Sequence, residues 1–384
     1  MKWSSLFRKT FLSPFLEFIH DSRAIGIILL LCTFLSLLIA NSGTSAAYLQ
    51  FWNTSISHNN YLPHSILHWI NDGLMSIFFF LAGMEIKREM ISGELSSLKK
   101  SLLPVIAAVG GMIVPALIFI FFNSKTDYSH GWGIPMATDI AFSLGVASLL
   151  GKRVPLGLKV FFTALAIIDD LGAIVTIAVF YSATLQWYYL LAAAIVLIIL
   201  LLLNKFKVKF GWWNYLLGLA LWFCVFNSGI HATIAGVLFA FAIPLNKLPS
   251  LEHKFHDAVN FLILPLFALA NTAIILPADI SSAISSKLSM GIIAGLLIGK
   301  PLGITLICFL AVKLNIAQLP SKTNWKKLLG VGLLAGIGFT MSIFISMLAF
   351  DDTAWQDISK IAVLAASLLA MLIGFLWLRF FTKL

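Results

Sequence analysis

The stretch "AIIDDLGA", residues 166–173, places two adjacent aspartates inside a long apolar run. The sequence "VFFTAL" precedes it and "IVTIAVFY" follows it, so residues 156–180 are long and apolar enough to cross a bilayer, which takes about 20 such residues. A charge at the centre of a membrane helix costs roughly 3 kcal/mol or more and usually marks a path for ions or protons. The pair therefore predicts a membrane-spanning helix with a functional site near its centre.

The composition extends this prediction to the whole chain. The 384 residues are 60% hydrophobic and only 11% charged, with a mean hydropathy of +0.97. A soluble domain carries about 25% charged residues, so we expect an all-α polytopic membrane protein. Cys32, Cys224 and Cys308 lie far apart in separate apolar runs, and their spacing indicates neither a disulfide framework nor a metal centre. We expect no cofactor.

Twelve apolar segments are candidates for membrane spans. They lie near residues 24–41, 66–86, 102–122, 133–150, 156–180, 186–203, 210–227, 229–244, 258–277, 289–312, 328–350 and 358–380. The chain then divides into a cytoplasmic N-terminal segment, 1–23, and one transmembrane domain, 24–384.

The basic residues test this arrangement. With the N-terminus inside, the cytoplasmic segments hold 21 of the 26 Lys and Arg residues, and the outer loops hold only Lys125 and Lys287. This bias follows the positive-inside rule and predicts that both termini are cytoplasmic. The net charge of +10 is thus explained by the membrane topology, and no nucleic-acid partner is needed to explain it. Lys159 and Lys360, near span ends, are expected to extend their side chains to the interface.

Four charged residues lie near span centres: Asp139, Asp169, Asp170 and Lys300. Neighbouring helical residues differ by about 100° around the axis, so Asp169 and Asp170 cannot face one partner equally. Lys300 is the only central cation and is the natural partner of one aspartate. We expect the other aspartate to face a water-filled cavity.

Two further spans combine polar residues with residues that weaken a helix. They contain "PMATDIAFSLG" (135–145), with Thr138 and Asp139, and "LLAGIGFTMSIF" (333–344), with Gly336, Gly338 and Thr340. These are the fourth and eleventh spans, the centres of the triplets 3–5 and 10–12, which begin on opposite sides of the membrane. Interrupted spans at corresponding places in two repeats point to a transporter binding site, so we expect inverted repeats with two interrupted, crossing helices.

The chemistry of such a site follows from its oxygen atoms. Na⁺ needs several hard oxygen ligands, and the carboxylates that supply them also bind protons. Burial disfavours the charged form of a carboxyl group, which lets protons compete with Na⁺. A carrier that crosses the membrane only when loaded with one or the other must exchange them.

Seven motifs resemble those of the NhaA family of sodium/proton antiporters, from about residue 20 to the last span. They are "GMEIKREMISGELSS" (83–97), "MATDIAFSLGVASLLGKRVP" (136–155), "ALAIIDDLGAI" (164–174), "SGIHATIAGV" (228–237), "LEHKFH" (251–256), "GKPLGI" (299–304) and "GIGFTMSIFI" (336–345). This family is itself a known example of inverted repeats. The resemblance implies a protein of the bacterial inner membrane that exchanges cytoplasmic Na⁺ or Li⁺ for external protons, electrogenically and under pH control.

The resemblance also implies roles for individual residues. Asp170 matches the carrier of the metal ion and the proton, and Asp169 matches the partner of Lys300; both would be transient ligands of Na⁺ or Li⁺. Asp139 and Thr138 would help line the site. A second proton would be carried by Asp169 or Lys300, and the sequence leaves this open. A cytoplasmic group linked to pH activation matches Glu85, Arg88, Glu89, Glu252, His253 and His256.

Alternative interpretations remain for three features. A Na⁺-coupled solute symporter or a cation channel is the alternative function. An aspartyl protease is disfavoured, because neighbouring aspartates on one helix point apart, so we expect no enzyme.

The outer loop 42–64 contains the strand-like "AYLQFW", and the resemblance implies a homodimer formed through a hairpin there. The alternative is a mobile surface loop. His231, in "GIHATIAG", is at least as readily explained as a hydrogen-bonded structural histidine.

Overall fold

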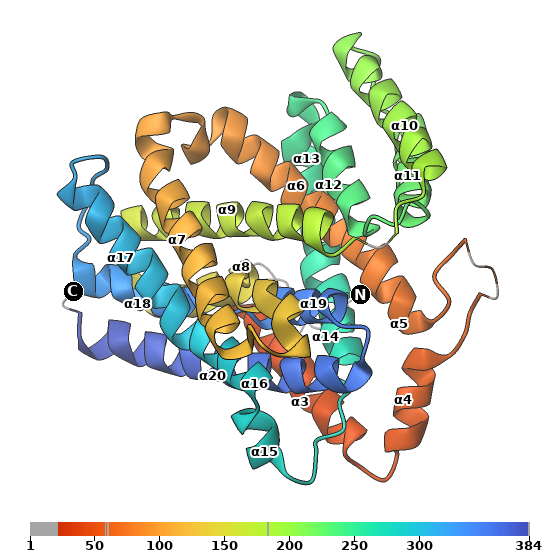
Figure 1. The fold of residues 1–384 in the computed structure, drawn as a ribbon. Helices are drawn as coiled ribbons and strands as arrows, with labels where there is room; N and C mark the ends of the chain where they lie inside the picture. The colour runs from red at the N-terminus through yellow and green to blue at the C-terminus, as the bar shows by residue number, and fades with distance from the viewer. Residues whose placement is uncertain (1–21, 58, 60, 183, 383–384) are drawn as a thin grey trace, which may run out of the picture.

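The computed structural model describes residues 22–57, 59, 61–182 and 184–382 (Figure 1). Within these residues the chain forms helices and no strand, and the only β pairing is an isolated bridge between Ser55 and Ser65. The predicted all-α fold is therefore confirmed. Most of the predicted cytoplasmic segment 1–23 lies outside the described residues.

The helices of the first half precede residue 181. They are α3 (Ser22–Ala40), α4 (Ser45–Asn53), α5 (Ile66–His68), the π-helix η2 (Trp69–Leu74), α6 (Met75–Ser92), η3 (Glu94–Ser96), α7 (Leu98–Asn123), η4 (Asp127–Met136), α8 (Ile140–Leu149), η5 (Gly151–Arg153) and α9 (Leu156–Phe180).

The helices of the second half continue to residue 380. They are α10 (Trp187–Lys205), α11 (Trp212–Phe226), α12 (Thr233–Ala242), η6 (Leu245–Lys247), α13 (Leu248–Ala258), the π-helix η7 (Val259–Ile263), α14 (Leu264–Asn271), α15 (Ile280–Ser285), α16 (Lys287–Ala294), the π-helix η8 (Gly295–Gly299), α17 (Lys300–Lys313), α18 (Trp325–Ala335), α19 (Phe339–Ala349) and α20 (Thr353–Phe380).

All twelve predicted spans coincide with helices. Among the described residues, six helices are long and apolar enough to cross a membrane, and four bent helix pairs raise this number to as many as ten; α11 is a shorter apolar helix. The fourth and eleventh predicted spans are both bent pairs, η4 with α8 and α18 with α19, at 43° and 48°. The protein is thus a multi-pass membrane protein, and its fourth and eleventh predicted spans are each interrupted.

The ninth span differs from its predicted bounds of 258–277. Its helix begins earlier, at α13, and ends at Asn271. Pro249 lies in the first turn of α13, where a proline costs no hydrogen bond, and the side chains of Leu251 and Glu252 are buried. The connection "PLNKLPSLEHKFHD" is therefore largely helical.

The strand expected at "AYLQFW" is wrong, because these residues belong to α4. Tyr48 and Trp52, four residues apart, make an edge-to-face contact with ring centroids 5.8 Å apart, and the Asn53 side chain donates to the Leu49 carbonyl at 3.0 Å. Both contacts join neighbours on one helical face. Trp52 is buried, whereas Phe51 is exposed, so one side of α4 packs against the protein.

Two pairs of helices approach each other closely at glycines: α7 with α17, and α6 with α12. A side chain at Gly303 of α17 would come within 2.2 Å of the Gly110 carbonyl oxygen on α7, and one at Gly236 of α12 would come within 2.1 Å of the Ser76 oxygen on α6. Small residues let membrane helices approach in this way. The α7 and α17 helices pack beside the interrupted spans, and α10 and α11 pack together at one side of the molecule (Figure 1).

Candidate ion-binding site

The two interrupted spans meet at their breaks. The breaks comprise Ala137–Asp139 between η4 and α8, and Gly336–Gly338 between α18 and α19. The backbone N–H of Asp139 donates to the Ile337 carbonyl at 2.7 Å, which fixes one break against the other. Each break exposes the end of one half-helix and the beginning of the next, so polar groups are needed there.

The Asp139 carboxylate accepts hydrogen bonds at the N-termini of the two half-helices that follow the breaks, α8 and α19. Its Oδ1 accepts from the Phe142 N–H of α8 at 2.9 Å. Its Oδ2 accepts from the Thr340 N–H of α19 at 3.1 Å and from the Thr340 hydroxyl at 2.5 Å. A carboxylate near helix N-termini is stabilised by the positive end of each helix dipole. Asp139 is only 2% exposed, so these contacts replace the water that it has lost.

Hydrogen-bond donors lie at the C-terminal ends of the two half-helices that precede the breaks, η4 and α18. The Lys300 ammonium donates to the carbonyl of Met136, the last residue of η4. The Thr138 hydroxyl lies 2.9 Å from the carbonyl of Ala335, the last residue of α18. The same hydroxyl lies 2.9 Å from Asp169 Oδ2. Because Thr138 has one hydroxyl proton, it donates to only one of these oxygens at a time.

Asp169 and Lys300 form the predicted contact. Lys300 Nζ lies 2.6 Å from Asp169 Oδ2, and both side chains are fully buried. Asp169 Oδ1 is buried as well and has no hydrogen-bond partner among the described residues. The pair therefore keeps one free acceptor oxygen inside the protein.

Asp170 faces a different environment. It is 5% exposed and borders a cavity of about 200 Å³, which Asp139, Thr340, Asn260 and Glu85 also line. Its Oδ1 has no partner in the described part of the chain. The cavity reaches His256, whose side chain is 49% exposed, so it joins the buried carboxyl to the surface. This arrangement can bring a cation or a proton to Asp170.

Comparison with known proteins places this sequence in a family. The sequence profile of the family described as Na⁺/H⁺ antiporter 1 matches residues 16–378. The chain belongs to this family. It is 51% identical to the Na⁺/H⁺ antiporter NhaA of Cytophaga hutchinsonii, over 96% of this chain and 95% of that protein. It is 50% identical to the NhaA of Flavobacterium psychrophilum over 96% of each chain, and 48% identical to that of Citrobacter koseri over 94% of this chain and 97% of that protein.

The residues expected to respond to pH lie on two helices of this NhaA-family protein, α6 and α13. Arg88 makes an ion pair with Glu252 and lies 3.3 Å from Glu89. Glu85 and His256 line the cavity itself. His253 is exposed on α13. The structure thus gathers Arg88, Glu89 and Glu252 into one group and brings Glu85 and His256 to the cavity.

Sequence reasoning missed a cluster around Asp72, which is buried in η2. Asp72 Oδ2 lies 2.9 Å from His68 Nε2, and Oδ1 lies 3.3 Å from His231 Nε2. The other ring nitrogen of His231 lies 3.0 Å from the Thr233 hydroxyl. His231 is therefore hydrogen-bonded to Thr233 and lies beside the Asp72 carboxylate, which agrees with its interpretation as a structural histidine. The position of His68 four residues before Asp72 was the available signal.

A second missed contact involves Lys360. We expected its side chain to reach the interface, but it is only 8% exposed, and its ammonium lies 3.4 Å from Asp357. The spacing of three residues on α20 brings the two side chains together, so an ion pair replaces the expected water contact.

Proposed function

We propose that the protein exchanges Na⁺ or Li⁺ for protons across the membrane. The observation that carries this proposal is Asp170, a buried carboxyl with an unpartnered oxygen at a cavity that leads to the surface. A carboxylate in such a place needs either a cation or a proton, because an isolated buried charge is costly. Family membership and the names of the relatives support the same activity.

The two loads compete for the same oxygens. Na⁺ would bind carboxylate oxygens of Asp170 and, transiently, of Asp169, with Asp139, Thr138 and Thr340 near enough to line or shape the site. A proton on Asp170 removes the charge that attracts Na⁺. The breaks at Gly336 and Gly338 leave this region free of continuous helix, which lets its polar groups face the ion.

Exchange of more than one proton for each Na⁺ needs a second carrier. Asp169 Oδ1 is an unused acceptor, and Lys300 would release or bind a proton when its pair with Asp169 opens. A second proton carried by either Asp169 or Lys300 would make the exchange electrogenic. We keep both assignments, and the experiments below separate them.

The remaining features of the proposal concern topology and assembly. We propose both termini on the cytoplasmic side of a bacterial inner membrane, with 1–23 as a cytoplasmic segment and 24–384 as one transporter domain. Spans 3–5 and 10–12 form its core and the other spans form a scaffold. Homodimerisation through 42–64 remains a proposal, with α4 in place of the hairpin. The ion-paired group of Arg88, Glu89 and Glu252 lies on the same two helices as Glu85 and His256, which line the cavity, and this supports regulation by pH.

The test is Na⁺-driven proton movement in inside-out vesicles. We expect added Na⁺ or Li⁺ to drive protons out of acidified vesicles, and we expect Asp170→Asn to abolish this while the protein stays folded and inserted. Asp351→Asn is a matched control, since Asp351 is exposed and does not line the cavity. Near-normal exchange by Asp170→Asn would overturn the carrier assignment. Uptake of Na⁺ together with a solute, or Na⁺ flux without opposed proton flux, would favour the symporter or the channel.

A further inference from the structure

Asn260 differs from the other buried asparagines in the described part of the chain. Asn71 and Asn271 donate hydrogen bonds to each other's side chains, and Asn123 donates to two backbone carbonyls. Asn260 is similarly buried, at 8% exposed, but its side chain makes no hydrogen bond with any described residue. Burial of an amide without a partner is unfavourable, so Asn260 needs a partner that the protein itself does not supply.

The Asn260 amide opens into the ion-binding cavity. Asn260 lines this cavity together with Asp170, and its amide atoms are not sealed off by the surrounding protein. His256, at the exposed end of the cavity, lies four residues earlier on the same helix. At 1.5 Å per residue, Asn260 is about 6 Å deeper along the helix axis. A cation that enters from the surface therefore passes His256 and meets the amide inside the cavity.

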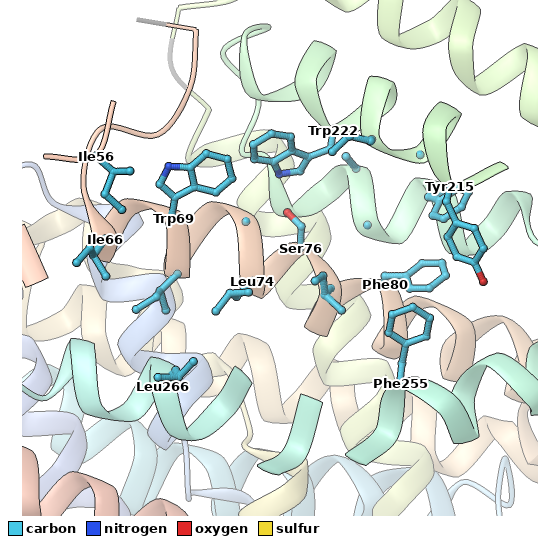
Figure 2. A pocket seen from close by; sticks show the side chains of 18 of the residues that line it. Ile56, Ile66, Trp69, Leu74, Ser76, Phe80, Tyr215, Trp222, Phe255 and Leu266 are labelled. Carbon is cyan, nitrogen blue, oxygen red and sulfur yellow. The ribbon is translucent and has the colours of Figure 1, made fainter. Parts of the chain in front are cut away.

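Other contacts of this helix hold Asn260 toward the cavity. Phe255 of α13 lies in a separate apolar groove, where its ring meets that of Phe80 edge to face, with centroids 5.4 Å apart (Figure 2). Leu266 of α14 lines the same groove. Because Phe255 and Leu266 fix one face of the helix there, the face that carries Asn260 stays turned toward the ion-binding cavity.

The backbone around Asn260 is irregular as well. Asn260 belongs to the π-helix η7, in which the Leu264 N–H donates to the Val259 carbonyl, five residues earlier. The next residue, Pro265, has no N–H. The Asn260 carbonyl therefore lacks the donors that the fourth and fifth residues after it would supply in a regular helix. Single π-helical turns within α-helices are frequent at functional sites, and this one offers a main-chain oxygen beside the side-chain oxygen.

The other polar residues of the cavity leave room for a further oxygen ligand. Both carboxylate oxygens of Asp139 already accept hydrogen bonds, from Phe142 and Thr340. Asp170 makes no hydrogen bond with a described residue, but it offers at most its two carboxylate oxygens. An alkali cation that leaves water must replace a shell of several oxygens, and carbonyl oxygens do this in channel filters. An amide oxygen adds such a ligand and takes up no proton at neutral pH.

We propose that the side-chain oxygen of Asn260 is a ligand of the cation in this cavity. It binds Na⁺ or Li⁺ from the α13–α14 helix, whereas Asp170 binds the ion from α9; the proposal rests on the proposed exchange at Asp170. Because the amide takes up no proton, Asn260 strengthens binding of the cation and leaves binding of the competing proton unchanged. Asn260 thereby sets the Na⁺ concentration at which the cation displaces the proton.

The test measures Na⁺ affinity directly. Purified full-length protein in detergent is titrated with Na⁺ by isothermal titration calorimetry at alkaline pH, where protons compete least. Asn260→Ala removes the oxygen ligand, so Na⁺ affinity should fall about tenfold, the lower end of the effect of a polar group that contacts a charge. Asn260→Asp keeps an oxygen at the same place and should restore the affinity.

Asn123→Ala is the matched control. Asn123 is a buried asparagine that does not line the cavity, and it donates to the carbonyls of Phe119 and Lys287. Its replacement should lower the melting temperature and leave Na⁺ affinity unchanged. An equal loss of Na⁺ affinity in Asn123→Ala and Asn260→Ala would assign the effect to general destabilisation and overturn the proposal.

The pH dependence separates a ligand from a residue that acts through Asp170. Loss of a Na⁺ ligand weakens Na⁺ binding by the same factor at every pH. If Asn260 instead donated a hydrogen bond to the Asp170 carboxylate, Asn260→Ala would favour protonated Asp170 and would weaken Na⁺ binding only at acidic pH. A loss confined to acidic pH would therefore refute the ligand assignment, and so would a loss that Asn260→Asp does not restore.

Unchanged Na⁺ affinity in Asn260→Ala at alkaline pH would also overturn the proposal, since water alone would then satisfy the amide. The exchange proposal is judged separately, from the wild-type protein and Asp170→Asn. If Na⁺ binding competes with protons and is lost in Asp170→Asn, the exchange proposal stands whatever the result for Asn260→Ala. If the wild-type protein binds no Na⁺, both proposals fail.

Discussion

Removing either partner of the Asp169–Lys300 pair should destabilise the protein strongly. Lys300→Ala leaves the Asp169 carboxylate buried with Thr138 as its remaining partner, and it also leaves the Met136 carbonyl without its donor. Breaking a buried ion pair by removing one partner costs about 3–5 kcal/mol. Asp169→Asn should cost less, because its amide oxygen can still accept from Lys300. The assay is thermal unfolding of the purified variants in one detergent.

The double variant Asp169→Asn with Lys300→Gln should recover much of this loss. It contains no lone buried charge, and its two amides can still donate and accept. We expect its loss to be at least about 2 kcal/mol smaller than the sum of the single losses, within the range of coupling between residues in contact. The control is Asp357→Asn with Lys360→Gln, because that pair is 3.4 Å apart and Asp357 is 42% exposed. Its coupling should stay below about 1 kcal/mol.

The same double variant separates the two candidates for the second proton carrier from a purely structural pair. If the pair carries a proton, exchange in this variant should become electroneutral or fail. If the pair only stabilises the fold, exchange should persist and should still depend on membrane potential. Additive stability losses in the double variant would show that Asp169 and Lys300 do not interact, and this would refute the reasoning about the pair.

Three further predictions follow from individual contacts. Asp139→Asn should keep exchange measurable while lowering the free energy of unfolding by about 1–2 kcal/mol, because the negative charge at the N-termini of α8 and α19 is lost. A loss of exchange as complete as in Asp170→Asn would make Asp139 an obligatory carrier. Arg88→Gln removes the positive charge beside Glu252, and this loss favours the protonated form of the Glu252 carboxyl, so the pH profile of exchange should move toward alkaline pH. Lys254→Gln, at an exposed lysine, should leave the profile in place. An unshifted profile in Arg88→Gln would exclude the Arg88–Glu252 pair from the pH response. Gly303→Ala should greatly reduce the yield of folded protein, because its Cβ would come within 2.2 Å of the Gly110 carbonyl; Gly26→Ala has open space and should express normally, and equal yields would show that α7 and α17 do not approach so closely.

The main architecture could be predicted because it follows from local rules. Helical geometry separates Asp169 from Asp170, and Lys300 is the only central cation, so the residues alone predict that Lys300 pairs with one of the two aspartates. The resemblance to the NhaA family indicated that this aspartate is Asp169. The breaks at 137–139 and 336–338 follow from proline, glycine and polar residues in otherwise apolar runs.

Other features depend on which distant segments meet. The Met136 carbonyl as an acceptor for Lys300 depends on where η4 ends, and the Asp72–His231 contact joins residues from different spans. Neither has a local pattern that predicts it. At α4 the local pattern was ambiguous, because short aromatic segments suit both strands and amphipathic helices, and the structure has a helix there.

The central claim is that Na⁺ and a proton compete for Asp170. The most direct test is to measure Na⁺ binding to the purified protein by isothermal titration calorimetry at several pH values and in buffers of different ionisation enthalpy. We expect that Na⁺ binding releases protons, that Na⁺ affinity weakens about tenfold for each unit by which the pH falls on the acidic side, and that Asp170→Asn removes both effects. Na⁺ binding with an affinity independent of pH, or with the same proton release in Asp170→Asn, would contradict it.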